Sequence, residues 1–234
     1  MSKKAILLLQ FRENNLIARH EKNCILRSTG RENHLVVKNI FSDNSKFSKG
    51  NLLGISGIII GGSSFNLSEK EGQLSLLVKI KKIIPILKKA IHFNVPILGI
   101  CFGHQYLAYI LGAKVVRNNS RKEVGTYEVS LTKAGKRDFL FDGLPKNFLV
   151  QEAHKDSIKK LPSKAILLAT SKTCKIQAFK FKNAYGVQFH PELNTEDMEF
   201  RAKFSPSYIQ GRKIKFKSTI FGKQILKNFL SLLQ

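Results

Sequence analysis

A cysteine flanked by two glycines carries the strongest chemical signal in the sequence. Cys101 is the centre of the run Gly99-Ile100-Cys101-Phe102-Gly103, which follows an apolar stretch. Glycines two residues to either side relieve the crowding where a buried strand turns sharply into a helix, and such an elbow presents its central side chain. The helix N-terminus beyond the turn is expected to stabilise the thiolate over the thiol. We therefore predict that Cys101 is a nucleophile; the alternative is a buried structural cysteine.

A histidine and a glutamate suited to assist this cysteine close a later apolar run. His190 and Glu192 lie two residues apart in Tyr185-Gly186-Val187-Gln188-Phe189-His190-Pro191-Glu192. Side chains two apart in an extended chain point to the same side, so Glu192 can set the tautomer of His190 and stabilise its protonated form. A cysteine nucleophile needs a base, and the base needs an orienting group. Alone the pair fits an exposed ion pair, but beside Cys101 it predicts a catalytic triad.

The chain before Gly112 alternates between strand-like and helical patterns. Residues 5–11, 55–60 and 95–100 are apolar runs of strand length, whereas residues 77–91 and 105–111 have apolar side chains at helical spacing. Pro85 is expected to kink or restart the first of these helices. Strand and helix in alternation predict an α/β fold whose mostly parallel sheet is covered on both faces. Cys101 would then lie at the C-terminal edge of the sheet, where open α/β folds place their sites.

The sequence after Gly112 has a different pattern of apolar residues. Short strand-like runs, which we interpret as hairpins and returning sheet strands, occupy residues 114–116, 124–131, 148–150, 166–170, 176–181 and 185–189. Residues 219–233 have the spacing of a closing helix, and residues 194–217 are polar, basic and poorly periodic, as in a mobile loop. No linker divides the chain, so we predict a single domain over residues 1–234 with a basic C-terminal extension from about residue 195.

Composition limits the classes of protein that the chain can represent. With 234 residues, 43% of them hydrophobic, it can bury one sizeable core, which excludes a disordered chain. Three widely spaced cysteines form no disulfide framework and no CxxC pair, and the six histidines form no HxH or HxxxH pair. The sequence therefore predicts no metal site and no cofactor. A reducing, cytoplasmic location fits, and the apolar run in MSKKAILLLQ is too short for a signal peptide or membrane span.

The charge of the chain is strongly positive but dispersed. Forty Lys and Arg against 16 Asp and Glu give a net charge of +24, and the basic residues fall on nearly every segment. Nucleic-acid sites usually concentrate charge on one face and interleave aromatic residues, an arrangement that this sequence does not show clearly. We therefore interpret the lysines as a solvated surface and a nucleic-acid partner as unlikely. The segment from Arg201 to Lys227, with eight basic residues and no acidic one, is the best candidate for an anion-binding patch.

The motifs together resemble those of class I glutamine amidotransferases. Gly99-Ile100-Cys101-Phe102-Gly103-His104-Gln105 and His190-Pro191-Glu192 are similar to the two signatures of this family, and the resemblance runs from about Ala5 to Glu192. Within the family, these segments are most similar to the amidotransferase domain of GMP synthase and to its free-standing relatives. The resemblance implies a flavodoxin-like three-layer sandwich with an additional antiparallel hairpin region, and a Cys-His-Glu triad.

The resemblance also implies a role for each residue of the triad. Cys101 would attack the side-chain amide of glutamine and form a glutamyl thioester, releasing ammonia, and water would then release glutamate. His190 would deprotonate the thiol, protonate the departing ammonia and activate the water, and Glu192 would orient His190. The chain would therefore be a glutaminase with a cysteine nucleophile.

Further residues are implied in binding the substrate. Backbone N–H groups of Phe102 and Gly62 would form the oxyanion hole, and Gly61, Gln105 and His154 would line the glutamine site. The pair Gly61-Gly62, taken alone, is equally a tight turn at a strand end.

The sequence departs from the family pattern in two segments before Glu192. Ser63 stands where the family usually has proline, which is expected to loosen the oxyanion turn. In Glu152-Ala153-His154-Lys155-Asp156, Ala153 and Lys155 replace two residues of a Ser-His-Gly-Asp core. His154 is therefore open to two interpretations, a residue that couples the activity to a partner or a satisfied surface histidine.

The chain contains no segment that would use the ammonia. It has no GxxxxGK[ST] phosphate-binding loop, so the chain is expected either to act as a free-standing relative or to pair with a separate ATP-dependent synthetase, for which the kind that makes GMP in purine biosynthesis is the first candidate. Two alternatives stay open. The same scaffold could hydrolyse γ-glutamyl peptides or act as another thiol hydrolase, or the chain could be a non-catalytic nucleic-acid-binding or regulatory protein.

Overall fold

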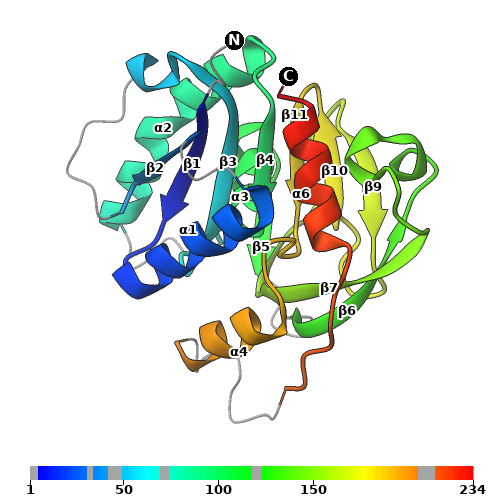
Figure 1. Cartoon of the computed structure of the whole chain (residues 1–234). Coiled ribbons are helices and arrows are strands. Elements are labelled where there is room, and N and C mark those ends of the chain that lie inside the picture. Colours follow the sequence, from blue (N-terminus) through cyan, green and yellow to red (C-terminus); the bar gives the residue numbers. More distant parts are fainter. Residues whose placement is uncertain are drawn as a thin grey trace.

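The computed structural model describes residues 5–30, 34–41, 49–68, 74–117, 123–204 and 214–233. A nine-stranded sheet in the order β2-β1-β3-β4-β11-β10-β9-β6-β7 crosses the molecule (Figure 1). Its strands are β1 (Ala5–Phe11), β2 (Leu35–Asn39), β3 (Ile55–Ser63), β4 (Ile97–Ile100), β6 (Glu123–Leu131), β7 (Asn147–His154), β9 (Ile166–Thr170), β10 (Ala178–Phe181) and β11 (Ala184–Val187). A two-stranded sheet pairs β5 (Val115–Arg117) with β8 (Asp156–Ile158).

The large sheet is parallel in one half and antiparallel in the other. Strands β2, β1, β3, β4 and β11 run parallel to one another, whereas β10, β9, β6 and β7 are joined by antiparallel pairs. The predicted α/β fold with an additional antiparallel region is therefore confirmed. Because β4 and β11 are parallel neighbours, the segments that follow both strands emerge at the same edge of the sheet.

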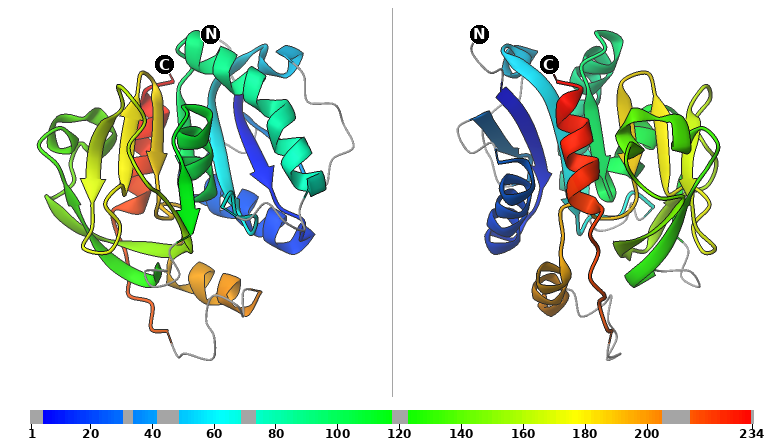
Figure 2. Two further views of the ribbon diagram at one scale, coloured as in Figure 1. Left: turned by 180° about the vertical axis from the view of Figure 1, so that it is seen from behind. Right: turned by 45° about the vertical axis from the view of Figure 1, so that its right-hand side comes forward.

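Helices cover both faces of the parallel half, as Figure 2 shows from behind and from the side. Helices α1 (Asn15–Thr29) and α6 (Gly222–Ser231) lie on one face, and α2 (Leu74–His92) and α3 (Phe102–Ile110) lie on the other. In β1, Ile6 and Leu8 belong to the same buried cluster as residues of α1 and α6, whereas Leu7 and Leu9 belong to the cluster of α2 and α3. A strand buried on both faces is apolar at every position, which explains its continuous apolar run.

Two elements near the N-terminus were absent from the sequence-based expectations. Helix α1 begins after Asn14, whose side chain accepts from the N–H groups of Leu16 and Ile17, and ends at Gly30 with φ 60°. These are ordinary helix-capping signals. Strand β2 is short and lies at the edge of the sheet.

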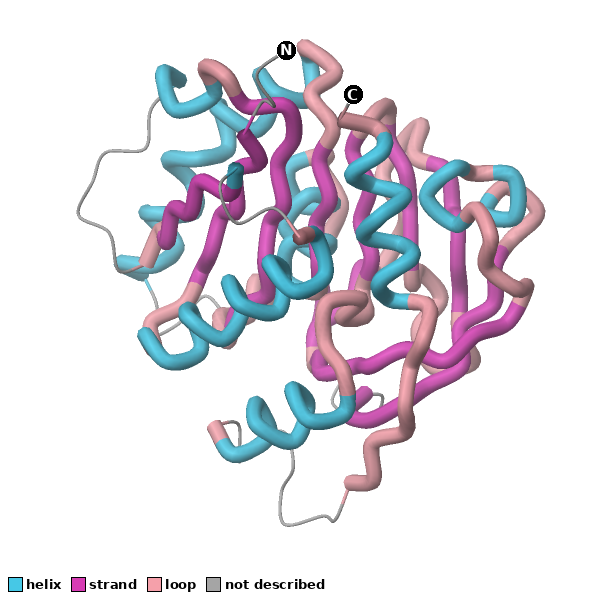
Figure 3. The backbone as a smooth tube through the Cα atoms, viewed as in Figure 1, coloured by secondary structure: helices cyan, strands magenta, loops and turns pink. Residues whose placement is uncertain are grey.

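The chain after Glu192 is more ordered than a loop. Residues Thr195–Lys203 form α4, which begins with a capping box between Asn194 and Asp197, so the expectation of a loop is wrong there. The rest of the expected loop up to residue 217 has no regular structure where it is described, and residues 205–213 lie outside the described part. The closing helix is present as α6, and α2 continues through Pro85 without a restart. The tube in Figure 3 shows α4 apart from the helices that cover the sheet.

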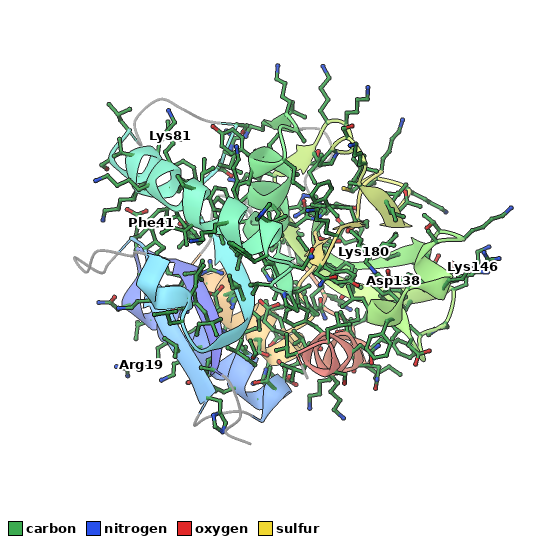
Figure 4. The ribbon with its side chains drawn as sticks, turned by 90° about the horizontal axis from the view of Figure 1, so that it is seen from above. Arg19, Phe41, Lys81, Asp138, Lys146 and Lys180 are labelled. Carbon is green, nitrogen blue, oxygen red and sulfur yellow. The ribbon has the colours of Figure 1, made fainter. Side chains whose placement is uncertain are left out.

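Basic side chains project in different directions from the molecule. Lys81 and Lys146 are exposed and extend outward on opposite sides in Figure 4, whereas Lys180 pairs with Asp138 at 2.9 Å.

Within the described residues, no helix has both the length and the apolarity that a membrane span requires.

Glycine at position 103 allows α3 to pack directly on β3. A Cβ atom at Gly103 would lie 2.2 Å from the carbonyl oxygen of Ile60, and one at Gly99 would lie 2.4 Å from the carbonyl oxygen of Gly103. Both distances are shorter than any ordinary contact, and both obstacles are backbone atoms. The glycines of the elbow are therefore required by the close approach of strand and helix.

We expect Gly103→Ala to reduce the free energy of unfolding by about 2–4 kcal/mol, because α3 must move away from β3. Urea denaturation of the purified variant measures the loss. Gly30→Ala is the control, because Gly30 has a positive φ but nothing within 4 Å of its Cβ position. That change should cost about 1 kcal/mol, and an equal loss in both variants would contradict the packing argument.

Candidate active site

Cys101 occupies the turn between β4 and α3, as its flanking glycines predict. Its φ of 52° and ψ of −101° are rare for a residue with a side chain, and its N–H donates to the carbonyl oxygen of Val187 at 2.9 Å. Such backbone strain is typical of functional turns. The Cys101 Sγ lies 3.8 Å from the carbonyl oxygen of Ala153 in β7. Cys101 is therefore placed by three neighbouring segments of the fold.

The resting sulfur of Cys101 is a thiol. Burial raises the pKa of Cys101 to about 12, and the charge of Glu152 adds to the rise, whereas Arg12 and a hydrogen bond from the N–H of Phe102 act in the opposite direction. The N–H at the helix N-terminus favours the thiolate as expected, but desolvation of the charge outweighs it. The thiol must lose its proton to a base during the reaction.

His190 and Glu192 are directly hydrogen-bonded. The N–H of His190 donates to the carbonyl oxygen of Gln151 at 2.9 Å, and His190 Nδ1 lies 2.8 Å from Glu192 Oε1. Burial raises the pKa of Glu192, but the charges of His190 and Arg201 outweigh burial and lower it to about 2. Because a carboxylate can only accept, His190 donates its Nδ1 proton, and Nε2 is the ring nitrogen that remains for proton transfer.

Two cavities meet at Cys101. The first, which we call the His190 cavity, is lined by Arg12, Ser63, Ser64, Cys101, Val124, Ala153, His190, Leu193, Met198, Arg201, Ala202 and Phe216. The second, which we call the Gln105 cavity, is lined by Ser63, Phe65, Asn66, Cys101, Phe102, Gln105, Ala153, His154, Lys155 and Asp156. The structure thus brings Cys101 and His190 into one cavity, and Cys101 with Gln105 and His154, the two side chains expected at the substrate, into the other.

The oxyanion turn differs from its expected form. The N–H of Gly62 donates to Glu21 Oε1 at 3.0 Å, and a Cβ at Gly61 would lie 2.7 Å from the same carboxylate. The hydroxyl of Ser63 donates to the carbonyl oxygen of Phe11 at 2.7 Å and accepts from the N–H of Phe65 at 3.0 Å, which ties the turn to the end of β1. The N–H of Phe102 hydrogen-bonds to the sulfur of Cys101.

A buried ion pair that no sequence motif indicated lies behind this turn. Arg12 Nη2 lies 2.6 Å from Glu21 Oε1, and Gln10 Nε2 donates to Glu21 Oε2 at 3.0 Å. Arg12 follows β1 and lines the His190 cavity, and its Nη2 would lie 2.7 Å from a Cβ at Gly62. Arg12 could not be found from spacing, because its partner belongs to a helix that the sequence did not reveal.

The comparisons with known proteins agree with this geometry. The family model "Glutamine amidotransferase class-I" matches residues 21–204. The chain belongs to the class I glutamine amidotransferase family.

Relatives of this amidotransferase include archaeal proteins whose names describe one subunit of a glutamine-hydrolysing GMP synthase. The one from Thermoplasma volcanium is 30% identical over 92% of this chain and 86% of the relative. The one from Pyrococcus abyssi is 44% identical over 46% of this chain, and the match spans about half (56%) of that relative. Among solved structures, a glutamine amidotransferase from Thermotoga maritima superposes with a TM-score of 0.74 at 25% identity, covering 100% of this chain and 97% of that chain.

The substrate-side residues of this amidotransferase are hydrogen-bonded within the protein. Gln105 Nε2 donates to the carbonyl oxygen of Asp156 at 2.8 Å and to Gln188 Oε1 at 3.1 Å. His154 is 3% exposed, so the interpretation of a surface histidine is wrong. Its Nε2 lies 2.8 Å from Glu123 Oε2, and its Nδ1 lies 2.9 Å from the carbonyl oxygen of Asp156. Both side chains therefore shape the wall of the Gln105 cavity.

Two groups of side chains in the described residues have the composition of metal ligands. They are His20 with Cys24 and Asp197, and Glu123 with His154 and Cys174, and in each group the ligand atoms lie within 4.8 Å of one another. Spacing rules missed both because their members come from distant segments. In both groups the imidazole already hydrogen-bonds to a carboxylate, and we assign a metal to neither.

Glu152 gives this amidotransferase a pH-dependent stability. Burial raises the pKa of Glu152 to about 8, and the pKa of His154 beside it is also raised, because its hydrogen bond to Glu123 and the nearby carboxylates outweigh burial. Both groups bind protons more tightly in the folded chain, so stability falls as the pH rises from about 4.5 to about 8.

We expect Glu152→Gln to lose less stability than the wild type between pH 5 and pH 8, because the amide has no proton to release. Urea denaturation at both pH values measures the difference. Glu128→Gln, at an exposed position on β6, is the control and should follow the wild type. Parallel losses in all three proteins would contradict the assignment to Glu152.

Proposed function

We propose that this chain hydrolyses glutamine to glutamate and ammonia through a thioester on Cys101. The observation that carries the proposal is the shared cavity of Cys101 and His190, with His190 Nδ1 fixed by the buried carboxylate of Glu192 at 2.8 Å. A nucleophile, a base that contacts it and a group that orients the base form the minimum set for acyl transfer by a thiol.

The reaction follows from the proton positions. His190 Nε2 takes the proton from the thiol as the sulfur bonds to the amide carbon of glutamine, and the imidazolium gives that proton to the leaving nitrogen as the C–N bond breaks. Water then loses a proton to His190 and attacks the thioester carbon. The C–S bond breaks, the sulfur regains a proton, and glutamate leaves.

The glutamine side chain would enter through the Gln105 cavity. Gln105 and His154 form part of its wall, and the N–H of Phe102, which lies beside the sulfur, would donate to the carbonyl oxygen of the substrate as that oxygen becomes the oxyanion. Gly62 can complete the oxyanion hole only if its N–H is released from Glu21, because a single N–H cannot serve both. Gly61 would keep the turn close to the Glu21 carboxylate.

We infer that a separate ATP-dependent synthetase receives the ammonia. The names of the archaeal relatives describe one subunit of a GMP synthase, which supports a partner of that kind. The three free cysteines are compatible with the cytoplasm as the location. We also propose that residues 1–234 act as one amidotransferase domain, with α4 and the segment after it as its basic extension.

Ammonia release from glutamine, measured with and without a synthetase that activates a nucleotide, tests the proposal. Activity of the chain alone, or only in the mixture, supports it and shows whether the partner controls the site. If the chain released no ammonia from glutamine in either assay but hydrolysed γ-glutamyl peptides, glutamine would not be the substrate. Silence with every amide, together with salt-sensitive binding to RNA or DNA, would favour a binding protein.

A further inference from the structure

Helix α4 brings an arginine to the acidic end of the triad. The helix, which lies below the sheet in Figure 1, starts three residues after Glu192 and has Arg201 in its last turn. Arg201 Nη1 lies 3.4 Å from Glu192 Oε1, the same oxygen that accepts the Nδ1 proton of His190 at 2.8 Å. Both side chains are largely buried, with 12% of Arg201 and 1% of Glu192 exposed. One carboxylate oxygen is thus shared by two hydrogen-bond donors.

The guanidinium is fixed from its other side by α1. Arg201 Nε donates to His20 Nδ1 at 3.3 Å, so this nitrogen must be unprotonated, and His20 Nε2 lies 3.2 Å from Asp197 Oδ1. Burial lowers the pKa of His20, and the charge of Arg201 lowers it further against the pull of Asp197. His20 is therefore neutral, and it orients Arg201 without cancelling its charge.

The attachment of α4 to α1 does not depend on Arg201 alone. Asp197 forms an ion pair with Arg27, and the rings of His20 and Phe200 stack with centroids 4.5 Å apart. Met198 also packs in a small cluster with residues of α1 and of the segment after His190. Docking of the helix and contact with Glu192 can therefore be separated by mutation.

We propose that Arg201 is a positioning residue for the hydrolysis proposed above, on which this inference rests: it divides the charge of Glu192 between its guanidinium and the imidazole of His190. The other titratable groups that line this cavity are Arg12, which is charged and paired with Glu21, and Cys101, which is a neutral thiol. With Arg201 on the same carboxylate oxygen, Glu192 stabilises a second proton on the imidazole less than it would alone.

The pH profile of kcat/KM for glutamine tests this role. In Arg201→Gln the full charge of Glu192 acts on His190, so the imidazolium is more stable and the midpoint of the acid limb moves up by about 1 pH unit. Arg201→Lys keeps a positive charge at this position and should restore most of the shift. Arg27→Gln is the matched control, because it removes a cation that anchors α4 through Asp197 but does not contact Glu192.

A second readout keeps the test independent of glutamine hydrolysis. The rate at which iodoacetamide alkylates Cys101 depends on proton transfer to His190, so its acid limb should shift upward in Arg201→Gln as well. An unshifted midpoint in Arg201→Gln, or an equal shift in Arg27→Gln, would overturn the proposal and reduce Arg201 to an anchor of α4. If the wild type hydrolyses no glutamine, the proposed function fails, and the alkylation profiles still decide the role of Arg201.

Discussion

Cys101→Ala is expected to reduce ammonia release from glutamine by about 10⁴-fold or more, to the level of the uncatalysed background, because no other group can form the thioester. In the described residues the other two cysteines, Cys24 and Cys174, lie outside both cavities that meet at Cys101. Burial also raises the pKa of each of them to about 12. Neither thiol can substitute for Cys101. The measurement is steady-state ammonia release, with Cys174→Ala as the control that should keep its activity.

The strained backbone of Cys101 also leads to a prediction about stability, which would not hold for a cysteine in an ordinary conformation. Cys101 holds a φ of 52° and a ψ of −101°, a conformation that glycine adopts without strain and alanine does not. We expect Cys101→Gly to be more stable than Cys101→Ala by about 1 kcal/mol, although both are inactive. Thermal or urea unfolding of the two variants measures this. A glycine variant that is less stable than the alanine variant would show that the turn is not strained.

The sequence was most informative where the pattern that determines a structure lies within one short segment. The apolar runs of β1 and β3 and the glycines around Cys101 predicted strands and an elbow, because each pattern is complete within about ten residues. His190 and Glu192 were found because they stand two residues apart, although they lie in the bend and turn that follow β11 and not in an extended strand. That this pair meets Cys101 in a glutaminase site was implied by the resemblance to the family and not by spacing.

Groups that depend on two distant segments were not predictable. Arg12 and Glu21 meet only because α1 folds back along β1, and no periodicity in the sequence indicated which charges would face each other. The pair of Glu123 and His154 joins β6 to β7 across a register that spacing alone does not fix. Helix α4 was missed because its stability comes from the capping box and from docking on α1, whereas its apolar periodicity is weak. The burial that makes Cys101 a thiol is likewise a property of the assembled core.

His190→Asn is the other change with a large expected effect. Without the imidazole the thiol has no base, and kcat/KM for glutamine should fall by about 10³–10⁴-fold at neutral pH. His92→Asn, at an exposed position on α2, is the control and should behave as the wild type. Ammonia release at pH 7 measures both variants.

The residual activity of His190→Asn should also change its dependence on pH. The remaining nucleophile is the small fraction of Cys101 that is ionised, and burial raises the pKa of that thiol to about 12. Below that pKa the thiolate fraction increases about tenfold with each unit of pH, so the rate should rise steadily from pH 7 to pH 10. The wild type, whose base is already competent at neutral pH, should not show this rise. A residual rate that is constant over the same range would mean that another group takes the proton from Cys101, and the assignment of His190 as the base would be wrong.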